Sequence, residues 1–457
     1  MNRVAQVNDS VPPFPLGVRN AFYFQFLNTA SFGTLLGVPM ILFFKDLGAS
    51  VFVLGVVTSI APLLMIFQIP ASRHVERIGY RPFVLSGWLL RAIFGIGMAI
   101  VALLPSSISN DIRIAAGVIF LAAYNVSRGI SSSGYMPWIC QLIPETIRGR
   151  FLATDQMTGS IAGLFSTLLI AVWLHFYSGM LGYAAVFIFS SIAGFWSIYF
   201  LRKIPDVVVP EKLKMNQEIP WREIFQNRSF KRILFMNFLF QIGVSGGGLF
   251  WIPLLKDHFG KSSDLILFMV GFVSLIAIGT QYLAGRIIDQ TGSKPVLTFA
   301  ILGAILHLLF WSLIAGHLIP LNGITLFFVM LSSGIAFPVF NVANTRIVMS
   351  TAPALAQSHS FAIFNVTVNL TGGCFPWIWG YGVDAFKSWD QVIVGSWHGN
   401  VYSLFYFVTA LFVTWAWWIF SQVEEPGALK MREMGNHFLV NNRITIFFSN
   451  FKSEGRI

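Results

Sequence analysis

The sequence is poor in charged residues and in cysteine, and both shortages exclude whole classes of protein. Charged residues make up only 11% of the 457 positions, whereas soluble domains carry about a quarter. The two cysteines, Cys140 and Cys374, lie far apart in apolar segments, so we expect neither a disulfide framework nor a metal site. The sequence also lacks a phosphate-binding P-loop, which argues against a protein that uses ATP directly as its energy source. Because no other catalytic signature is present, we expect a protein that is not an enzyme and that carries no cofactor.

Apolar residues take the place of the missing charges. They account for 55% of the chain, and the mean hydropathy is +0.70. About twelve apolar stretches approach the ~20 residues that a helix needs to cross a bilayer. We therefore predict an all-α, multi-pass integral membrane protein of an inner or plasma membrane, with the lipid bilayer as its partner. The predicted spans are Val18–Phe44, Val51–Ala71, Pro82–Leu104, Ile114–Cys140, Phe151–Phe176, Leu181–Leu201, Arg232–Leu255, Leu265–Ile288, Val296–Ile314, Ile324–Ser350, Ser358–Val383 and Val401–Phe420.

The longest polar stretch between two spans divides the chain into two six-helix halves. It runs from Arg202 to Lys231 and mixes basic with acidic residues, as a solvated linker does. We predict four segments in this order: an N-terminal half at 1–201, a central linker at 202–231, a C-terminal half at 232–423 and a tail at 424–457.

The basic residues are distributed unevenly between the loops, and this distribution predicts the orientation in the membrane. Loops after even-numbered spans hold the basic excess, for example Arg73 and Arg77 after the second span and Arg148 after the fourth. The positive-inside rule then places both termini, the linker and the tail in the cytoplasm. Topology and contact with anionic lipid explain the net charge of +11. Because no soluble segment interleaves aromatic residues with a basic stripe, we expect no nucleic-acid partner.

A short polar signature occurs twice with identical spacing. Glu76–Pro82 has the pattern E-x-x-G-x-R-P, and Asp289–Pro295 has the pattern D-x-x-G-x-K-P. Each copy lies between two long apolar stretches, so the two halves of the chain share a repeated loop. Parallel repeats around a central path are typical of membrane transporters.

The chemistry of this signature favours a mechanical role at the membrane surface. Gly79 and Gly292 permit a tight turn. Glu76 and Asp289 fall at helix ends, where a carboxylate can pair with arginine or cap the N-terminus of a neighbouring helix. We predict that such contacts latch the two halves together in one conformation and release them in another. The predicted latch residues are Glu76, Arg77, Gly79, Arg81, Asp289, Gly292, Lys294, Arg148, Arg150 and Asp155.

These loops resemble those of the major facilitator superfamily of secondary transporters. The hallmark loop of that family, G-x-x-x-D-R-x-G-R-R, corresponds to Ser72–Arg81 and again to Gly285–Lys294, with a few replacements in each copy. Pro144–Arg150 resembles the family's P-x-x-x-R-G segment after the fourth span. In the sugar-porter branch a glutamate precedes that proline by three residues, where this sequence has Gln141. The resemblance extends to Phe420, and it implies alternating access around a cavity lined by the first, fourth, seventh and tenth spans.

Two arginines lie deep within predicted spans, where charge is costly and usually functional. Arg128 falls at the midpoint of the fourth span, and Arg91 falls within the third. Because the resemblance places the fourth span at the cavity, we predict that Arg128 anchors the solute, with Asn125 on the same helical face. The other predicted solute-binding residues are Gln25, Asn28, Gln241, Asn341, Asn344 and Trp377. Each amide among them could equally hold helices together.

We favour a secondary transporter that moves a small polar solute, either an organic anion or a sugar-like molecule. It would act as a symporter or facilitator, and we expect a monomer. The coupling ion, a proton or sodium, stays open because no acidic residue lies in the middle of a span; Asp155 near a span end is one candidate. A first alternative is an exporter of amphiphilic compounds. A second is a non-transporting membrane sensor or lipid-handling protein, which would not need the paired latch loops.

Overall fold

The computed structural model describes residues 14–49, 51–177, 179–208, 221–261, 263–353, 356–386, 392–394, 397–425 and 427–429. Within them, twelve helical segments are long and apolar enough to cross a membrane, which confirms the predicted all-α membrane fold. The middle of the predicted linker, residues 209–220, and the predicted tail from residue 430 onward lie outside the described residues.

The N-terminal half begins with two interrupted spans. Its elements are α1 (Asn20–Leu36), α2 (Val38–Asp46), α3 (Val51–Leu63), η1 (Leu64–Phe67), α4 (Gln68–Ile78), α5 (Tyr80–Leu103), α6 (Asn110–Leu142), η2 (Glu145–Ile147), α7 (Arg148–Phe176) and α8 (Met180–Lys203). Gly37 separates α1 from α2 within the first span. In the second span, Pro62 lies at the end of α3, and the helix tightens into the short 3-10 segment η1 before α4 begins.

The C-terminal half follows a short helix from the linker, α10 (Trp221–Gln226). Its elements are α11 (Arg228–Pro253), η3 (Leu254–His258), α12 (Ser263–Thr291), α13 (Ser293–Ala315), α14 (Gly323–Thr351), α15 (Gln357–Ala385), the hairpin strands β1 (Val392–Val394) and β2 (Trp397–Gly399), and α16 (Val401–Ser421). Capping boxes start two of these helices: Asn322 pairs with Thr325 at α14, and Asn400 pairs with Ser403 at α16. Each box satisfies backbone N–H groups that have no partner within the helix.

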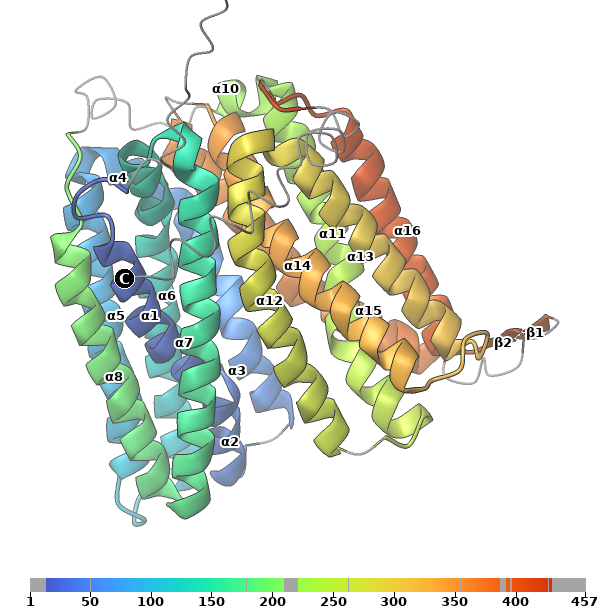
Figure 1. Cartoon of the computed structure of the whole chain (residues 1–457). Helices are drawn as coiled ribbons and strands as arrows, with labels where there is room; N and C mark the ends of the chain where they lie inside the picture. Colours follow the sequence, from blue (N-terminus) through green and yellow to red (C-terminus); the bar gives the residue numbers. More distant parts are fainter. Residues whose placement is uncertain are drawn as a thin grey trace, which may run out of the picture.

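Two glycine turns connect neighbouring spans at one end of the bundle. Gly79, between α4 and α5, has a φ of 96°, and Gly292, between α12 and α13, has a φ of 87°. A residue with a Cβ is strained in this region, so the tight turns predicted from the signature are present in both copies. Pro144, between α6 and α7, lies at the same end. We call this end, which is uppermost in Figure 1, the basic end, and we call the other the opposite end.

The helices of each half pack mainly on one another, and the two halves lie side by side (Figure 1). In the N-terminal half, α5 packs on α6 and α8, and α1 packs on α7 and α8. In the C-terminal half, α13 packs on α14 and α16, and α11 packs on α15 and α16. The boundary between the halves is formed chiefly by α7 against α12 and by α15 against α4 and α6.

Candidate functional site

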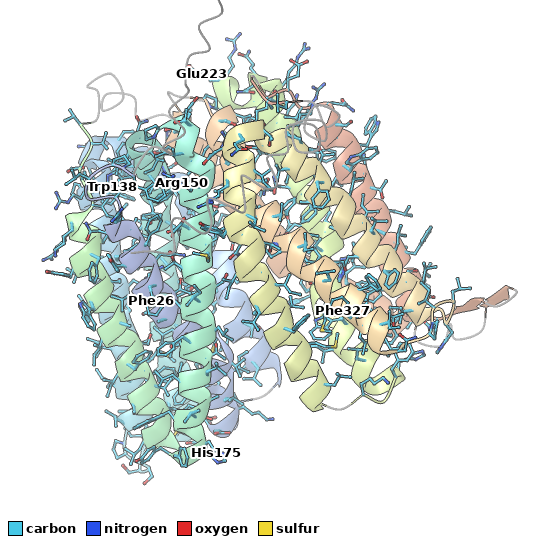
Figure 2. The ribbon with its side chains drawn as sticks, viewed as in Figure 1. Phe26, Trp138, Arg150, His175, Glu223 and Phe327 are labelled. Atoms are coloured by element: carbon cyan, nitrogen blue, oxygen red, sulfur yellow. The ribbon has the colours of Figure 1, made fainter. Side chains whose placement is uncertain are left out.

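Asp289 of the second signature copy closes the N-terminus of α7 across the boundary between the halves. Its two carboxylate oxygens accept hydrogen bonds from the backbone N–H groups of Gly149 and Arg150, at 2.7 and 2.8 Å. These donors belong to the first turn of α7, where intrahelical partners are lacking and the helix dipole favours negative charge. The predicted capping of a neighbouring helix by Asp289 is therefore present. Figure 2 shows Arg150 at the basic end and His175 at the opposite end of the same helix.

Two glycines allow α7 and α12 to approach closely enough for this contact. A Cβ on Gly285 would lie 2.3 Å from the Cβ of Ala153 and 2.7 Å from the carbonyl oxygen of Gly149. A Cβ on Gly149 would lie 2.6 Å from the Asp289 carboxylate. Both positions therefore require glycine in this conformation. Gly285 is the first residue of the second hallmark loop, and Gly149 belongs to the segment after the fourth span.

Arg346 of α14 connects this cap to a second one. Its guanidinium lies 3.7 Å from the Asp289 carboxylate and 3.1 Å from the Glu425 carboxylate. Glu425 follows α16 and accepts hydrogen bonds from the backbone N–H groups of Ser293 and Lys294, which begin α13, at 3.2 and 2.6 Å. Each carboxylate thus caps one helix, and the single positive charge of Arg346 lies between the two. Arg346 and Glu425 could not be recognised from the sequence, because neither belongs to a repeated motif.

Glu76 of the first signature copy is buried at the corresponding place between α4 and α15, but its contacts differ. It faces the hydroxyl of Ser358 in the first turn of α15. One turn before Glu76 on α4, the hydroxyl oxygen of Ser72 lies 2.7 Å from Nδ1 of His359 on α15. That hydroxyl already donates to the carbonyl of Ile69, so the histidine is the donor. The α4–α15 contact is therefore made by side chains, whereas the α7–α12 contact uses backbone N–H groups.

Further polar pairs cross the boundary between the basic end and the middle of the bundle. They are Gln68 with Asn365 at 3.2 Å, Gln141 with Gln357 at 3.0 Å and Ser160 with Gln281 at 3.1 Å. Gln141, which stands where sugar porters have a glutamate, is thus one member of an amide pair between the halves.

The basic residue of each signature copy bonds within its own half. Arg81, at the start of α5, donates to the carbonyl of Arg202 at the end of α8. Lys294, at the start of α13, donates to the carbonyl of Ser421 at the end of α16. The two copies therefore repeat the same contact, which ties the third span of a half to its sixth.

Two other predicted latch residues do not cross the boundary through their charged groups. Arg148 donates to the carbonyls of Cys140 and Ile143 and lies 3.1 Å from Glu145, all around the end of α6. Arg77 is exposed at the basic end. The contacts thus divide the predicted set: Asp289 and Glu76 face the other half, whereas the cationic groups mostly hold loops within a half.

One face of α15 marks where the halves diverge. Asn365 contacts Gln68, and a Cβ on Gly373 would lie 2.8 Å from the ring of Pro62. Residues four apart share a helical face, so Trp377 and Tyr381 continue this face toward the opposite end. Their side chains are 62% and 80% exposed. The predicted binding residue Trp377 therefore lies one helical turn beyond the contact between Gly373 and Pro62.

Arg91 lies in a polar cluster inside the N-terminal half. The guanidinium is buried and donates to the side-chain oxygen of Asn28, which also accepts from the indole N–H of Trp88 at 3.1 Å. It also lies over the rings of Trp88 and Tyr124, at 4.9 and 5.4 Å from their centroids. The side-chain oxygen of Asn28, a predicted binding residue, is therefore fully used by these two donors.

Arg128 lies next to this cluster with fewer partners. It is half-buried on α6, and one of its nitrogens lies 3.4 Å from the side-chain oxygen of Asn125. Its guanidinium lies 4.6 Å from the centroid of the Phe32 ring and near enough to Arg91 for the two cations to repel each other. Among the described residues, no carboxylate lies within salt-bridge distance of either arginine. Within the described part of the chain, one N–H of the Arg128 guanidinium makes a long hydrogen bond and its other four make none.

The remaining predicted binding residues are placed on several helices. Gln25 is half-buried on α1 against Gly159 of α7, and Gln241 is half-buried on α11 against Gly372 of α15. Asn341 is exposed on α14.

Asn344 has a structural partner. Its side-chain amide exchanges two hydrogen bonds with that of Asn237, at 2.7 and 3.0 Å, and both side chains are buried. This reciprocal pair joins α14 to α11, and each amide donates one hydrogen bond and accepts one.

Asp155 of α7 is enclosed within the N-terminal half. It is 5% exposed, and its Oδ1 has no hydrogen-bond partner among the described residues. The hydroxyl of Tyr135 on α6 is also buried without a partner and is close enough to interact electrostatically with this carboxyl group.

Known proteins share this architecture. A family model described as the Major Facilitator Superfamily matches residues 21–376. A sequence search of curated proteins found no match.

Solved structures of similar fold were found at low sequence identity. A proton:xylose symporter bound to a bromo-deoxyglucose aligns with a TM-score of 0.70 and 17% identity, over 92% of this chain and 98% of that one. The transporter FucP in an outward conformation aligns with a TM-score of 0.70 and 14% identity, over 90% and 99% of the chains. A human organic anion transporter aligns with a TM-score of 0.67 and 15% identity, over 90% and 100%. At these identities the likeness concerns the fold.

Proposed function

Because this chain belongs to the major facilitator superfamily, a family of membrane transporters and not of enzymes, we propose that it moves a small organic anion across the membrane by rocker-switch alternating access. The chain is a multi-pass integral membrane protein with twelve segments able to span the bilayer. The family leaves the solute open, so the proposed class rests on the interior of the N-terminal half.

The observation that carries the proposal is the pair of arginines in that interior. A deep charge without a counter-charge is costly, and Arg91 and Arg128 have no carboxylate partner in the described residues. Arg91 has a hydrogen bond to Asn28 and two aromatic faces around it, whereas most donors of Arg128 are unused. An anionic solute would supply the missing charge, with Asn125 holding the guanidinium in place. The fold is shared with a human organic anion transporter.

The latch contacts support alternating access. The polar pairs that join the halves extend from the basic end to the middle of the bundle, and beyond them the α15 face carrying Trp377 is exposed. We propose that the basic end faces the cytoplasm, as the positive-inside rule indicates. The described conformation is then closed to the cytoplasm, and transport requires Asp289 to release the N-terminus of α7 and Glu76 to separate from the Ser358 side chain of α15.

For energy coupling we propose a proton carried by Asp155. Buried ionisable groups within spans commonly serve as proton relays, and this carboxyl group has an unused oxygen beside an unpartnered hydroxyl. Its helix, α7, is the one that Asp289 caps. Once the solute is known, Asp155→Asn should abolish the dependence of uptake on a pH gradient in proteoliposomes while solute exchange continues. If uptake by the unaltered protein and by Asp155→Asn depended equally on pH, another residue would couple transport to the proton.

The test of the solute class is a thermal-shift screen of the purified protein against organic acids, sugars, nucleosides and amphiphilic drugs. A ligand at a hundred times its Kd stabilises the folded state by about 2.7 kcal/mol, so an organic acid should raise the Tm. The shift should vanish in Arg128→Ala and persist in Arg77→Ala, which removes an exposed arginine. A shift by neutral sugars that survives Arg128→Ala would favour the sugar-like solute. A response to amphiphiles alone would favour the exporter, and binding without uptake in proteoliposomes would favour the sensor.

A further inference from the structure

A cavity lies inside the C-terminal half, apart from the arginine cluster. Its volume is about 290 Å³, and it is enclosed by α11, α12, α13 and α14. Its lining includes Trp251, Met269, His307, Trp311, Ser333 and Phe337. These residues fall in the portions of the four helices that are nearer the opposite end. No charged side chain is among those that line it.

The cavity exists because α11 and α14 pack tightly near the basic end and separate beyond it. The Asn237–Asn344 pair fastens them, and the ring of Phe240 stacks on that of Phe340 with centroids 3.7 Å apart. Further along the same face of α11, Val244, Gly247 and Trp251 line the cavity. The small residues Val244 and Gly247 and the flat ring of Trp251 thus leave a space between the helices.

His307 supplies this space with a hydrogen-bond acceptor. Its side chain is 8% exposed, and its Nδ1 lies 2.8 Å from the hydroxyl oxygen of Ser332. That hydroxyl donates to the carbonyl of Val329, so Nδ1 carries the proton of the neutral ring. The other ring nitrogen, Nε2, is then an acceptor, and it has no hydrogen-bond partner in the described part of the chain. The rings of Trp311 and Phe337 meet His307 edge to face at 6.4 and 5.4 Å.

A hydroxyl group lies close by on α14. Ser333 lines the cavity next in sequence to Ser332, and its hydroxyl makes no hydrogen bond to any described residue. Ligand sites in proteins typically combine apolar walls with a few such polar groups. Val270, which lines the α12 side of the cavity, is substantially exposed, and we take this side as the entrance.

We propose that this cavity is a binding site for a small, neutral, apolar molecule that carries one hydroxyl group. The hydroxyl donates to His307 Nε2 and accepts from Ser333, while the apolar body fills the space against Met269, Trp311 and Phe337. An anion is disfavoured, because no cation lines the site to replace its water. The site is thus separate from the proposed anion site at Arg128 and does not depend on the proposed transport function.

The test compares two probes that differ only in a hydroxyl group, thymol and cymene, by their affinity for the purified protein. The unaltered protein should bind thymol more tightly, by about threefold to tenfold for one hydrogen bond to a neutral group. His307→Phe keeps an aromatic ring and removes the acceptor, so it should lower the affinity for thymol toward that for cymene, with the Ser333 hydroxyl as the remaining partner, and leave the affinity for cymene unchanged. His175→Phe, at an exposed histidine, is the matched control and should change neither.

Two further variants locate the binding. Ser333→Phe fills the cavity and should abolish binding of both probes, whereas Arg128→Ala should leave both unchanged. Equal affinities for thymol and cymene in the unaltered protein would overturn the proposal. So would full binding by Ser333→Phe, which would place the probes elsewhere, or loss of binding in Arg128→Ala, which would place them on the solute path. None of these outcomes depends on transport.

Discussion

The two contacts that join the halves at the basic end begin from the same signature but are built differently. At α7–α12, a carboxylate accepts two backbone N–H groups, and glycines bring the helix backbones together. At α4–α15, the contact consists of side chains, namely Glu76 facing Ser358 and Ser72 paired with His359. Backbone caps tolerate little displacement, because the donors are fixed in the helix. Side-chain pairs can follow a moving helix by changing rotamer.

Under the proposed alternating access, we expect the two contacts to have distinct roles. The α7–α12 contact should act as an all-or-none closure, since a small separation would break both hydrogen bonds and the glycine packing together. The α4–α15 contact should act as an adjustable seam. A distance measurement between spin labels on opposite halves, at the exposed positions Phe176 and Ile324, would report the balance between closed and open conformers. The exposed Cys374 would first be replaced by serine.

The largest effect is expected from Gly285→Ala. The added Cβ would lie 2.3 Å from that of Ala153, and overpacking of this kind costs about 1–3 kcal/mol. The spin-label distances should therefore shift strongly toward the conformer that is open at the basic end. Gly271→Ala on the same helix meets no atom within 4 Å and is the matched control. Equal distance distributions for the two variants would mean that the glycine packing does not set the closure.

Asp289→Asn should have the next largest effect. The amide can accept at one oxygen only, and it also loses the charge that faces the helix dipole and Arg346. Loss of a helix cap costs about 0.5–2 kcal/mol, so closed conformers should fall several-fold in the same distance measurement. Glu76→Gln should change the populations less, because the amide has nearly the same shape and can face the Ser358 hydroxyl as the carboxyl group does. A larger effect of Glu76→Gln would reverse the roles assigned to the two contacts.

Ser72→Ala tests the α4–α15 contact directly. It leaves the Nδ1–H of His359 buried without an acceptor, which costs about 1 kcal/mol or more. We expect a moderate loss of closed conformers that is largely recovered in the double variant Ser72→Ala with His359→Phe, where neither polar group remains. If the double variant is worse than Ser72→Ala alone, the pair contributes packing and not hydrogen bonding.

The smallest effect is expected from Lys294→Ala and Arg81→Ala. Both side chains bond carbonyls within their own halves, and exposed interactions of this kind contribute about 0.2–1 kcal/mol. Each variant should lower the Tm slightly and leave the spin-label distances unchanged. A shift in distances would show that the basic residues take part in the latch after all, as the sequence alone suggested.

The membrane fold could be predicted from the sequence because its signals are local. Hydropathy located the twelve spans, and the fixed spacing of the signature located the glycine turns at Gly79 and Gly292. The role of Asp289 as a helix cap also followed from its place at a helix end. The boundaries of the two halves and the binding role of Arg128 stay predictions.

Other parts of the site depend on contacts between residues far apart in the sequence. Arg346 lies near the end of an ordinary apolar span, and its importance comes from meeting Asp289 and Glu425 in space. Likewise, the hydrogen bonds between Asn344 and Asn237 show that Asn344 joins two helices, which its position in the sequence could not distinguish from a contact with the solute. Composition and spacing cannot distinguish these cases, because the same asparagine suits either role.

The Glu425 cap has a consequence for how the protein is made. The first N–H groups of α13 and the guanidinium of Arg346 receive their carboxylate from a residue that follows the last spanning helix. During synthesis, α13 and α14 therefore enter the membrane long before their partner exists. The basic end of the C-terminal half is therefore complete only once position 425 has been synthesised, because the N-terminus of α13 lacks its carboxylate cap until then.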